Sequence, residues 1–454
     1  MKIIRHGSAI YLAFLLLAAC MAALGFVLSS PGEILRGLYT IITTEDTLIT
    51  DYFASAGAGA ALINSAAVIG VSVGLLCLTR DPVTGSTVTT LGLMAGFALF
   101  GKNLANMLPI IFGTWLYSVF TREKFVKYVH ISLMASTLAP LVSFVAFRQG
   151  GTPGHIAMAL GVGVVIGFVM LILSSHTFHI QNGMNLFNMG FAGGLLAMVL
   201  VSLFKAFGAA PESTYFWSTR YTNVMSFFMG GVFLVLLAAG LSGGRKAVKS
   251  YGELIRCRDR APNDYISRFG APAVLINISL CGALALGYVL VSGGAVNGPT
   301  VGGIMVVAAF AVAGMNPRNI LPVMLGVLLG SALNKWEMDD PVMLLAGLFC
   351  TGLAPITDIF GIVPGFAAGF LHSSVVLFAG SPLGGLNLYN NGFSTGLVSI
   401  VMYPILSRIE KRREAVLDEG DYTDMFYPEE EDYGEERKPE AEDTLCAEDT
   451  VGKD

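Results

Sequence analysis

Uncharged polar side chains occur in pairs inside long apolar stretches of this sequence. The pairs are Asn64 and Asn277, Asn185 and Asn387, Asn188 and Asn390, and Thr87 and Thr300. An asparagine amide offers two donors and an acceptor oxygen without charge, and in apolar surroundings it needs a partner. Such groups can bind a small neutral or anionic solute, bridge two helices, or cap the broken end of a helix. The sequence leaves the binding role and the structural role both open.

Asp358 is one of the few acidic residues deep inside an apolar stretch, and it follows Leu353-Ala354-Pro355 closely. A carboxylate within a membrane segment is by default a proton or cation site, so we expect Asp358 to couple ions or protons. A location at the membrane interface is the alternative. No HExxH, GxSxG or phosphate-loop pattern is present in the sequence. We therefore predict no catalytic residue, no metal and no cofactor, and an enzyme is the less favoured class.

The composition requires that these residues are positioned by membrane helices. Hydrophobic residues make up 54% of 454 positions and charged residues 13%, with a mean hydropathy of +0.68. Such a chain is typical of an all-α polytopic membrane protein with lipid as its main solvent. Fourteen segments is the upper count, because several are short enough to be re-entrant or broken. We expect them at 9–28, 57–79, 85–101, 104–120, 128–147, 155–175, 184–205, 222–241, 269–292, 297–314, 318–335, 341–359, 361–379 and 384–405.

Positive charge predicts the orientation, because Lys and Arg concentrate on the cytoplasmic side. The clusters are Lys2 and Arg5, the 122–127 loop, the 243–268 loop and 408–413. All four lie inside in a fourteen-crossing arrangement, which places both termini in the cytoplasm of a plasma-membrane protein. Leu17-Ala18-Ala19-Cys20 resembles a lipoprotein processing site. The apolar run continues to Leu28, however, so we expect an uncleaved helix.

The sequence contains an internal repeat. At an offset of 213, Leu62-Ile63-Asn64 matches Leu275-Ile276-Asn277, and Leu108-Pro109 matches Leu321-Pro322. At an offset of 202, both copies share the pattern G-x-N-L-(F/Y)-N-x-G-F-x-x-G-L, which begins at Gly183 and Gly385. Matched Asn, Pro and Gly in one order indicate duplication.

Each copy contains about seven segments, and an odd number of crossings inverts the second copy relative to the first. We predict a first repeat at 1–205, a linker at 206–221, a second repeat at 222–407 and a disordered, cytoplasmic acidic tail at 408–454. From Glu414 onward the chain has 17 acidic and 3 basic residues, against 15 acidic and 24 basic residues before it. Such a tail has too few apolar residues to form a core.

With this repeat, the chain resembles an uncharacterised prokaryotic membrane-protein family whose domain of unknown function occurs twice in tandem. The resemblance implies topology and gives no activity. A stretch of about 45 residues is also similar in order to bacterial urea transporters. Its matches are Asn297-Gly298, Val301-Gly302, Met305, Phe310, Leu321-Pro322, Ser331-Ala332-Leu333, Lys335-Trp336 and Pro341. The pattern departs directly afterwards at 342–346, and the first copy has Thr84-Gly85 where the second has Asn297-Gly298.

Inverted repeats are frequent in transporters, with the solute site between the halves. We therefore expect a transporter or channel for a small polar solute, with a pathway at the repeat interface that includes the paired Asn and Thr residues. The alternatives are a membrane-embedded enzyme acting on a lipid-like substrate, and a membrane sensor or scaffold. The expected partners are the lipid bilayer and the solute, with no nucleic acid, and a homo-oligomer is compatible with the sequence.

Overall fold

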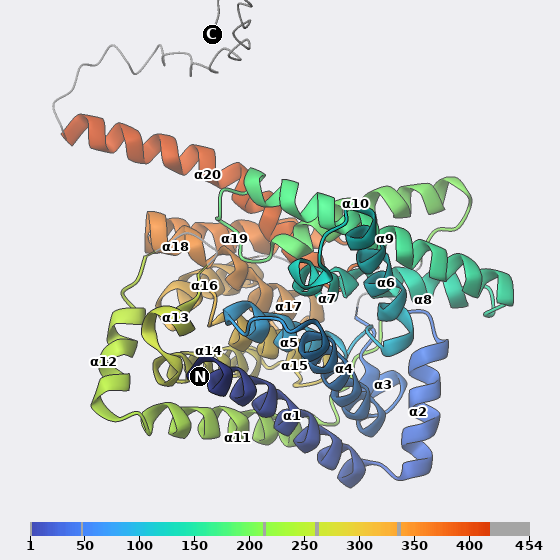
Figure 1. Ribbon diagram of the computed structural model, residues 1–454. Coiled ribbons are helices and arrows are strands. Elements are labelled where there is room, and N and C mark those ends of the chain that lie inside the picture. Colours follow the sequence, from blue (N-terminus) through green and yellow to red (C-terminus); the bar gives the residue numbers. More distant parts are fainter. Residues whose placement is uncertain (1, 47–48, 212–214, 259–262, 334–336, 418–454) are drawn as a thin grey trace, which may run out of the picture. The chain divides into compact units, whose positions relative to one another are not determined.

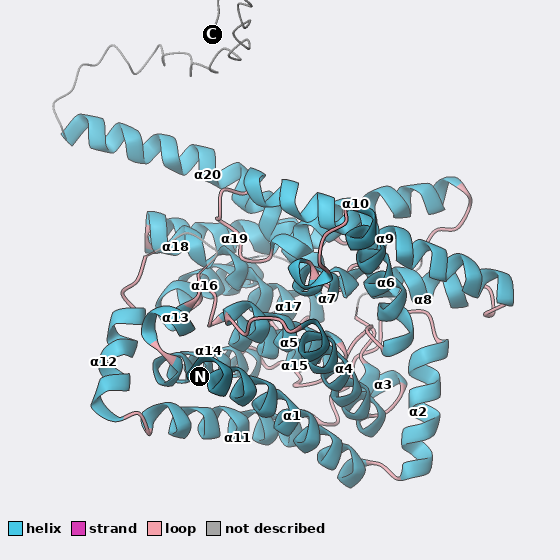
Figure 2. Ribbon diagram, viewed as in Figure 1, coloured by secondary structure: helices cyan, strands magenta, loops and turns pink. Residues whose placement is uncertain are grey.

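Helices and short loops make up the computed structural model, which describes all residues except 1, 47–48, 212–214, 259–262, 334–336 and 418–454. Figure 2 shows no strand in this part of the chain, where an isolated bridge between Thr50 and Phe216 is the only β pairing. Residues 1–406 form one compact unit, and a second unit begins at Ser407. The predicted all-α class is confirmed.

The two repeats contain the same elements in the same order (Figure 1). The first consists of α1 (Lys2–Leu28), α2 (Pro31–Thr43), α3 (Tyr52–Ser55), α4 (Ala58–Thr79), α5 (Gly85–Phe97), α6 (Leu104–Phe120), α7 (Val129–Ala135), α8 (Ala139–Phe147), α9 (Pro153–Ile180) and α10 (Asn188–Ala206). The second consists of α11 (Thr222–Leu241), α12 (Gly244–Leu254), α13 (Tyr265–Phe269), α14 (Ala271–Val291), α15 (Gly298–Phe310), α16 (Pro317–Leu333), α17 (Pro341–Phe349), α18 (Ala354–Phe360), α19 (Ile362–Ala379) and α20 (Asn390–Leu417).

Each apolar segment predicted from the sequence contains a helix within the described residues. Ten helical stretches within the described residues are long and apolar enough to cross a membrane, and α6, α15 and α16 are shorter apolar helices. The chain is thus a multi-pass membrane protein. α20 continues to Leu417, beyond the predicted start of the tail at 408, and the rest of that tail lies outside the described residues.

Four short helices were not predicted from the sequence. α2 begins with Ser30, which forms a capping box with Glu33, and α12 occupies much of the basic 243–268 loop. α3 and α13 begin with the capping residues Asp51 and Asp264. The apolar run length that reveals membrane segments does not report short or amphipathic helices.

The segments containing Leu-Ala-Pro are interrupted helices in both repeats. A 3-10 turn at Ser136–Leu138 separates α7 from α8, and a turn at Cys350–Leu353 separates α17 from α18. Pro140 and Pro355 stand in the first turn of the following helix, where the missing N–H costs no intrahelical bond. Both segments are therefore broken helices rather than continuous ones.

The equivalent helices α5 and α15 pack antiparallel against each other between the repeats. Each has 13 residues, which is about 20 Å of helix and shorter than the hydrocarbon core of a bilayer. A Cβ atom on Gly96 would lie 2.7 Å from the carbonyl oxygen of Gly302, and one on Gly92 would lie 2.2 Å from the Cβ of Ala309. This antiparallel crossing of equivalent elements agrees with the predicted inversion of the repeats.

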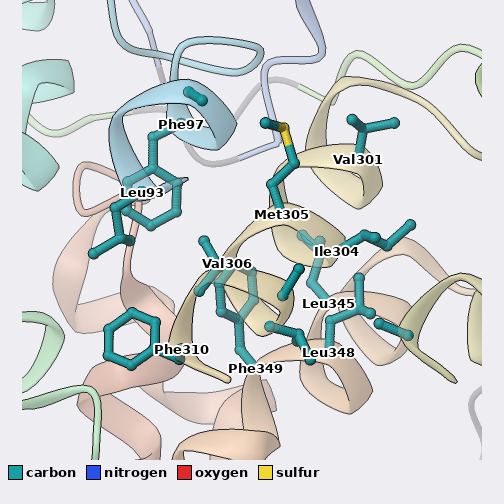
Figure 3. Packing of buried hydrophobic residues seen from close by; sticks show 14 of the residues in the cluster. Leu93, Phe97, Val301, Ile304, Met305, Val306, Phe310, Leu345, Leu348 and Phe349 are labelled. Atoms are coloured by element: carbon teal, nitrogen blue, oxygen red, sulfur yellow. The ribbon is translucent and has the colours of Figure 1, made fainter. Parts of the chain in front are cut away.

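Aromatic side chains fill the space beside this crossing. Figure 3 shows Phe97 of α5, Phe310 of α15 and Phe349 of α17 among aliphatic residues of the same helices. The ring of Phe97 lies 5.2 Å from that of Tyr389, and the ring of Phe310 lies 4.9 Å from that of Phe187. These are the same contact in the two repeats, because Phe97 matches Phe310 and Phe187 matches Tyr389 at the repeat offsets.

We predict that Gly96→Ala destabilises the protein, because its Cβ has no room against Gly302 and the two helices must move apart. The expected cost is about 1–3 kcal/mol. Thermal unfolding of the purified protein in detergent measures it. Gly74→Ala in α4 is the matched control, since no atom lies within 4 Å of a Cβ there. Equal melting temperatures for the two variants would contradict the close packing of α5 on α15.

Candidate functional site

The chain leaves helical geometry where α5 joins α6 and where α15 joins α16. Asn64 Nδ2 donates to the carbonyl oxygens of Ala98 at 2.7 Å and Lys102 at 2.8 Å. Asn277 Nδ2 makes the equivalent bonds to Ala311 at 2.8 Å and Met315 at 2.7 Å. Both asparagines are buried. Each amide thus satisfies backbone carbonyls that the end of a helix leaves without partners.

The remaining polar groups at these connections are also satisfied in matching ways. In the first repeat, Tyr52 N donates to Leu99 O at 3.2 Å, and Asn106 Nδ2 donates to Gly101 O at 3.1 Å. The second repeat repeats this pattern, with Tyr265 N bonded to Val312 O at 2.9 Å and Asn319 Nδ2 bonded to Gly314 O at 2.8 Å. Gly101 and Gly314 have φ values of +115° and +136°, which glycine adopts readily.

Thr87 and Thr300 lie in the first turns of α5 and α15. Thr87 Oγ1 accepts from Thr84 N at 3.1 Å, and Thr300 Oγ1 accepts from Asn297 N at 2.8 Å, so each completes a capping box. Asp51 of the first repeat reaches the same end of α15, where Oδ1 accepts from Gly298 N at 3.1 Å. Asp264 of the second repeat lies at the start of α5, where a Cβ on Gly85 would lie 3.0 Å from its Oδ1. An aspartate of each repeat therefore stands at the start of the other repeat's short helix.

Asn185 and Asn387 connect the repeats to each other. Asn185 Nδ2 donates to Gly392 O at 3.5 Å, and Asn387 Nδ2 donates to Gly190 O at 3.2 Å. Each amide oxygen accepts from a threonine hydroxyl, Asn185 from Thr395 at 3.1 Å and Asn387 from Thr137 at 3.0 Å. The stacked rings of Phe191 and Phe393 lie 5.7 Å apart beside these contacts. This arrangement joins the starts of α10 and α20.

The hydrogen bonding of Asn188 differs from that of its equivalent, Asn390. Asn188 Nδ2 donates to Ser174 O at 2.8 Å, and its oxygen accepts from Thr177 at 2.9 Å. Asn390 is buried, and its Oδ1 has no partner within the described residues. Of the six predicted asparagines, Asn390 is thus the one with a fully buried amide oxygen that lacks a partner within the described residues. The others hold the breaks and crossings of the fold, and their contact with a solute stays a prediction.

A family model described as "Protein of unknown function (DUF1576)" matches residues 30–206 and 244–408. The chain belongs to this family. The two matches follow the two repeats, which confirms the tandem duplication predicted from the sequence. No curated protein and no solved structure matches the chain. The urea-transporter resemblance gains no support from these comparisons, and two of its residues, Lys335 and Trp336, lie outside the described residues.

Asp358 is buried against the connection between α15 and α16. Its Oδ2 accepts from Asn319 Nδ2 at 2.7 Å. Asn106 is the equivalent of Asn319, and it donates to Ser143 Oγ at 3.0 Å and to Asp46 Oδ2 at 3.3 Å. Each repeat therefore has a buried carboxylate beside the same asparagine, but Asp46 comes from the loop after α2 and Asp358 from α18. Alignment of the repeats pairs Asp358 with Ser143, so sequence reasoning missed Asp46.

Lys102 is a second residue that sequence reasoning missed. It lies between α5 and α6 and is completely buried, with its Nζ 3.3 Å from Met94 Sδ and 5.3 Å from the centroid of the Phe97 ring. Its equivalent in the second repeat is Met315. A lysine between two apolar segments was the signal in the sequence that could have indicated a buried charged residue. It was overlooked because charged residues at such positions usually face solvent.

We predict that Thr137 and Asn387 stabilise the protein as a pair. In a double-mutant cycle, Thr137→Val and Asn387→Ala should show a coupling energy of about 0.5–3 kcal/mol, because each substitution removes the hydrogen bond between these two side chains. Urea unfolding in detergent measures the cycle. Thr395→Val with Asn387→Ala is the matched control, since Thr395 bonds Asn185 instead. Additive effects in the first cycle would contradict the contact between the repeats.

We also predict that Asp46 makes stability depend on pH. Burial, with a smaller contribution from Glu45, raises the pKa of this loop carboxyl from 3.8 to about 7, against the hydrogen bonds from Tyr52, Ser143 and Asn106. The folded state then holds a proton that the unfolded chain releases, so this group lowers stability as pH rises from about 4 to about 7. Melting temperatures measured across that range should fall less in Asp46→Asn. A slope identical to that of the wild-type protein would show that Asp46 is ionised in the folded state.

Proposed function

We propose that this protein is a transporter or channel for a small polar solute, with the pathway at the interface of the two repeats. The observation that supports it is the antiparallel pair of short helices α5 and α15, each followed by a buried non-helical connection. Non-helical backbone at membrane depth is tolerated only where protein or a water-filled cavity surrounds it. Discontinuous helices at a repeat interface form the solute sites of many transporters.

Buried ionisable groups beside both connections support the same proposal. Asp46 and Asp358 lie beside Asn106 and Asn319, and Lys102 lies within the first connection. Placing such groups in a membrane protein is costly, and they commonly mark the paths of ions or polar solutes. Symmetric connections also suit alternating access, because exchange of the conformations of the two repeats gives two states of comparable energy.

We further propose a plasma-membrane location with both termini in the cytoplasm. The support is the distribution of Lys and Arg, which places the 122–127 and 243–268 loops and the 408–413 cluster on one side. The partners would be the bilayer and the solute, and a homo-oligomer is compatible with this topology.

Uptake by reconstituted vesicles tests the transport proposal directly. Radiolabelled urea, acetamide and acetate are suitable probes, because together they cover neutral and anionic small solutes. We expect at least one to enter faster than it enters protein-free vesicles. Rates equal to those of protein-free vesicles for all three would overturn the proposal for solutes of this size.

Coupling by Asp358 gives a separate prediction. Asp358→Asn should abolish accumulation driven by a proton or sodium gradient, because the amide cannot bind either cation as a carboxylate does, while exchange without a gradient persists. Asp339→Asn, which changes an exposed acid in the loop before α17, is the matched control. Undiminished gradient-driven uptake in the folded Asp358→Asn variant would remove this residue from the mechanism.

A further inference from the structure

Lys102 places a side-chain amine in the interior of the protein. Its side chain is completely buried, and none of the ion pairs among the described residues includes it. The one hydrogen-bond partner of its Nζ within the described residues is the sulfur of Met94, which is a weak acceptor. An ammonium has three donors and no acceptor, so at least two of its N–H groups have no strong partner here.

Tyr389 brings a second unsatisfied donor to the same region. It is buried, and its hydroxyl has no partner within the described residues. Its ring makes an edge contact with Phe97 at 5.2 Å between centroids, and Phe97 is the ring above which Lys102 Nζ lies at 5.3 Å. Lys102 and Tyr389 thus contact the same aromatic ring, one from each repeat.

Both residues also differ from their equivalents in the other repeat. The equivalents of Lys102 and Tyr389 are Met315 and Phe187, which have similar volumes and no strong donor. Met315 and Phe187 occupy the related positions in the same fold and are themselves buried. The architecture therefore has an apolar solution for each position, and packing alone does not require the lysine or the tyrosine.

The chemistry that satisfies both groups is an anion that only accepts hydrogen bonds. A buried ammonium loses its hydration at a cost of several kcal/mol. The face of the Phe97 ring and the carbonyl end of α5 offset part of this free energy of desolvation. They stabilise the charge without using its N–H donors. A carboxylate provides one negative charge and two acceptor oxygens, which matches one ammonium and one hydroxyl.

We propose that Lys102 and Tyr389 bind a small monocarboxylate, which makes the solute of the proposed pathway an organic anion. This inference rests on the proposed transport function for its physiological meaning, but binding can be measured without transport. Lys102 neutralises the carboxylate, and Tyr389 donates to its second oxygen.

Binding of radiolabelled acetate to the purified full-length protein in detergent tests the proposal. We expect saturable binding that unlabelled acetate displaces and that acetamide, its neutral analogue of the same shape, does not. Lys102→Met should weaken acetate binding by about tenfold or more, and Tyr389→Phe by less, since hydrogen bonds to charged groups are the stronger ones. Both variants introduce the residue that the other repeat carries, which favours correct folding.

Lys124→Met and Tyr39→Phe are the matched controls, because both side chains are exposed. They should bind acetate as the wild-type protein does. Equal displacement by acetamide, unchanged affinity in Lys102→Met, or no acetate binding by the wild-type protein would each overturn the proposal. The competition arm uses the wild-type protein and so does not depend on how the variants fold.

Vesicle uptake separates this inference from the transport proposal. Entry of urea or acetamide without acetate binding would leave a transporter of neutral solutes and remove the carboxylate. Acetate binding with no flux of any probe would keep the site and remove transport.

Discussion

The fold depends on satisfying the backbone at the ends of the two short helices. α5 and α15 end inside the protein, and the carbonyl groups that follow them cannot reach bulk water. An unsatisfied buried carbonyl costs about 1–3 kcal/mol, and each connection has several. The amides of Asn64 and Asn106 supply donors in the first repeat, and those of Asn277 and Asn319 do so in the second. Asparagine suits this task because one amide nitrogen serves two carbonyls and brings no charge.

Each repeat also completes the other. Asp51 accepts a hydrogen bond from the start of α15, and Asn387 bonds both Thr137 and Gly190 of the first repeat. The threonines that serve Asn185 and Asn387 are not equivalent in sequence, and the repeat partner of each is a glycine. A single repeat would leave these groups without partners. We infer that the two halves are stable only together, and that relative movement of the halves requires these contacts to change.

Much of the fold could be predicted from the sequence, because long apolar runs and repeated Asn, Gly and Pro residues report membrane helices and duplication. The short helices α2 and α12 could not, since their apolar residues cover one face and leave no long run. Asp46 was missed for a different reason. It accepts a hydrogen bond from Asn106 as Asp358 does from Asn319, but it comes from another position in the chain, and an alignment of the repeats compares only equivalent positions. Residues that lie in similar places without being equivalent in the sequence can be recognised only in the folded structure.

The comparison of the repeats also changes which residues are informative about chemistry. The paired Asn and Thr residues were the natural candidates from the sequence, yet, apart from Asn188 and Asn390, their matching hydrogen bonds are explained by the fold alone. Positions that differ between the repeats are not explained in this way. Lys102 replaces a methionine, Asp358 a serine and Tyr389 a phenylalanine, and all three are buried. Where an apolar or neutral residue already serves the same fold in the other repeat, packing alone does not explain an added charge or hydroxyl, and such positions are the ones for which we propose a function.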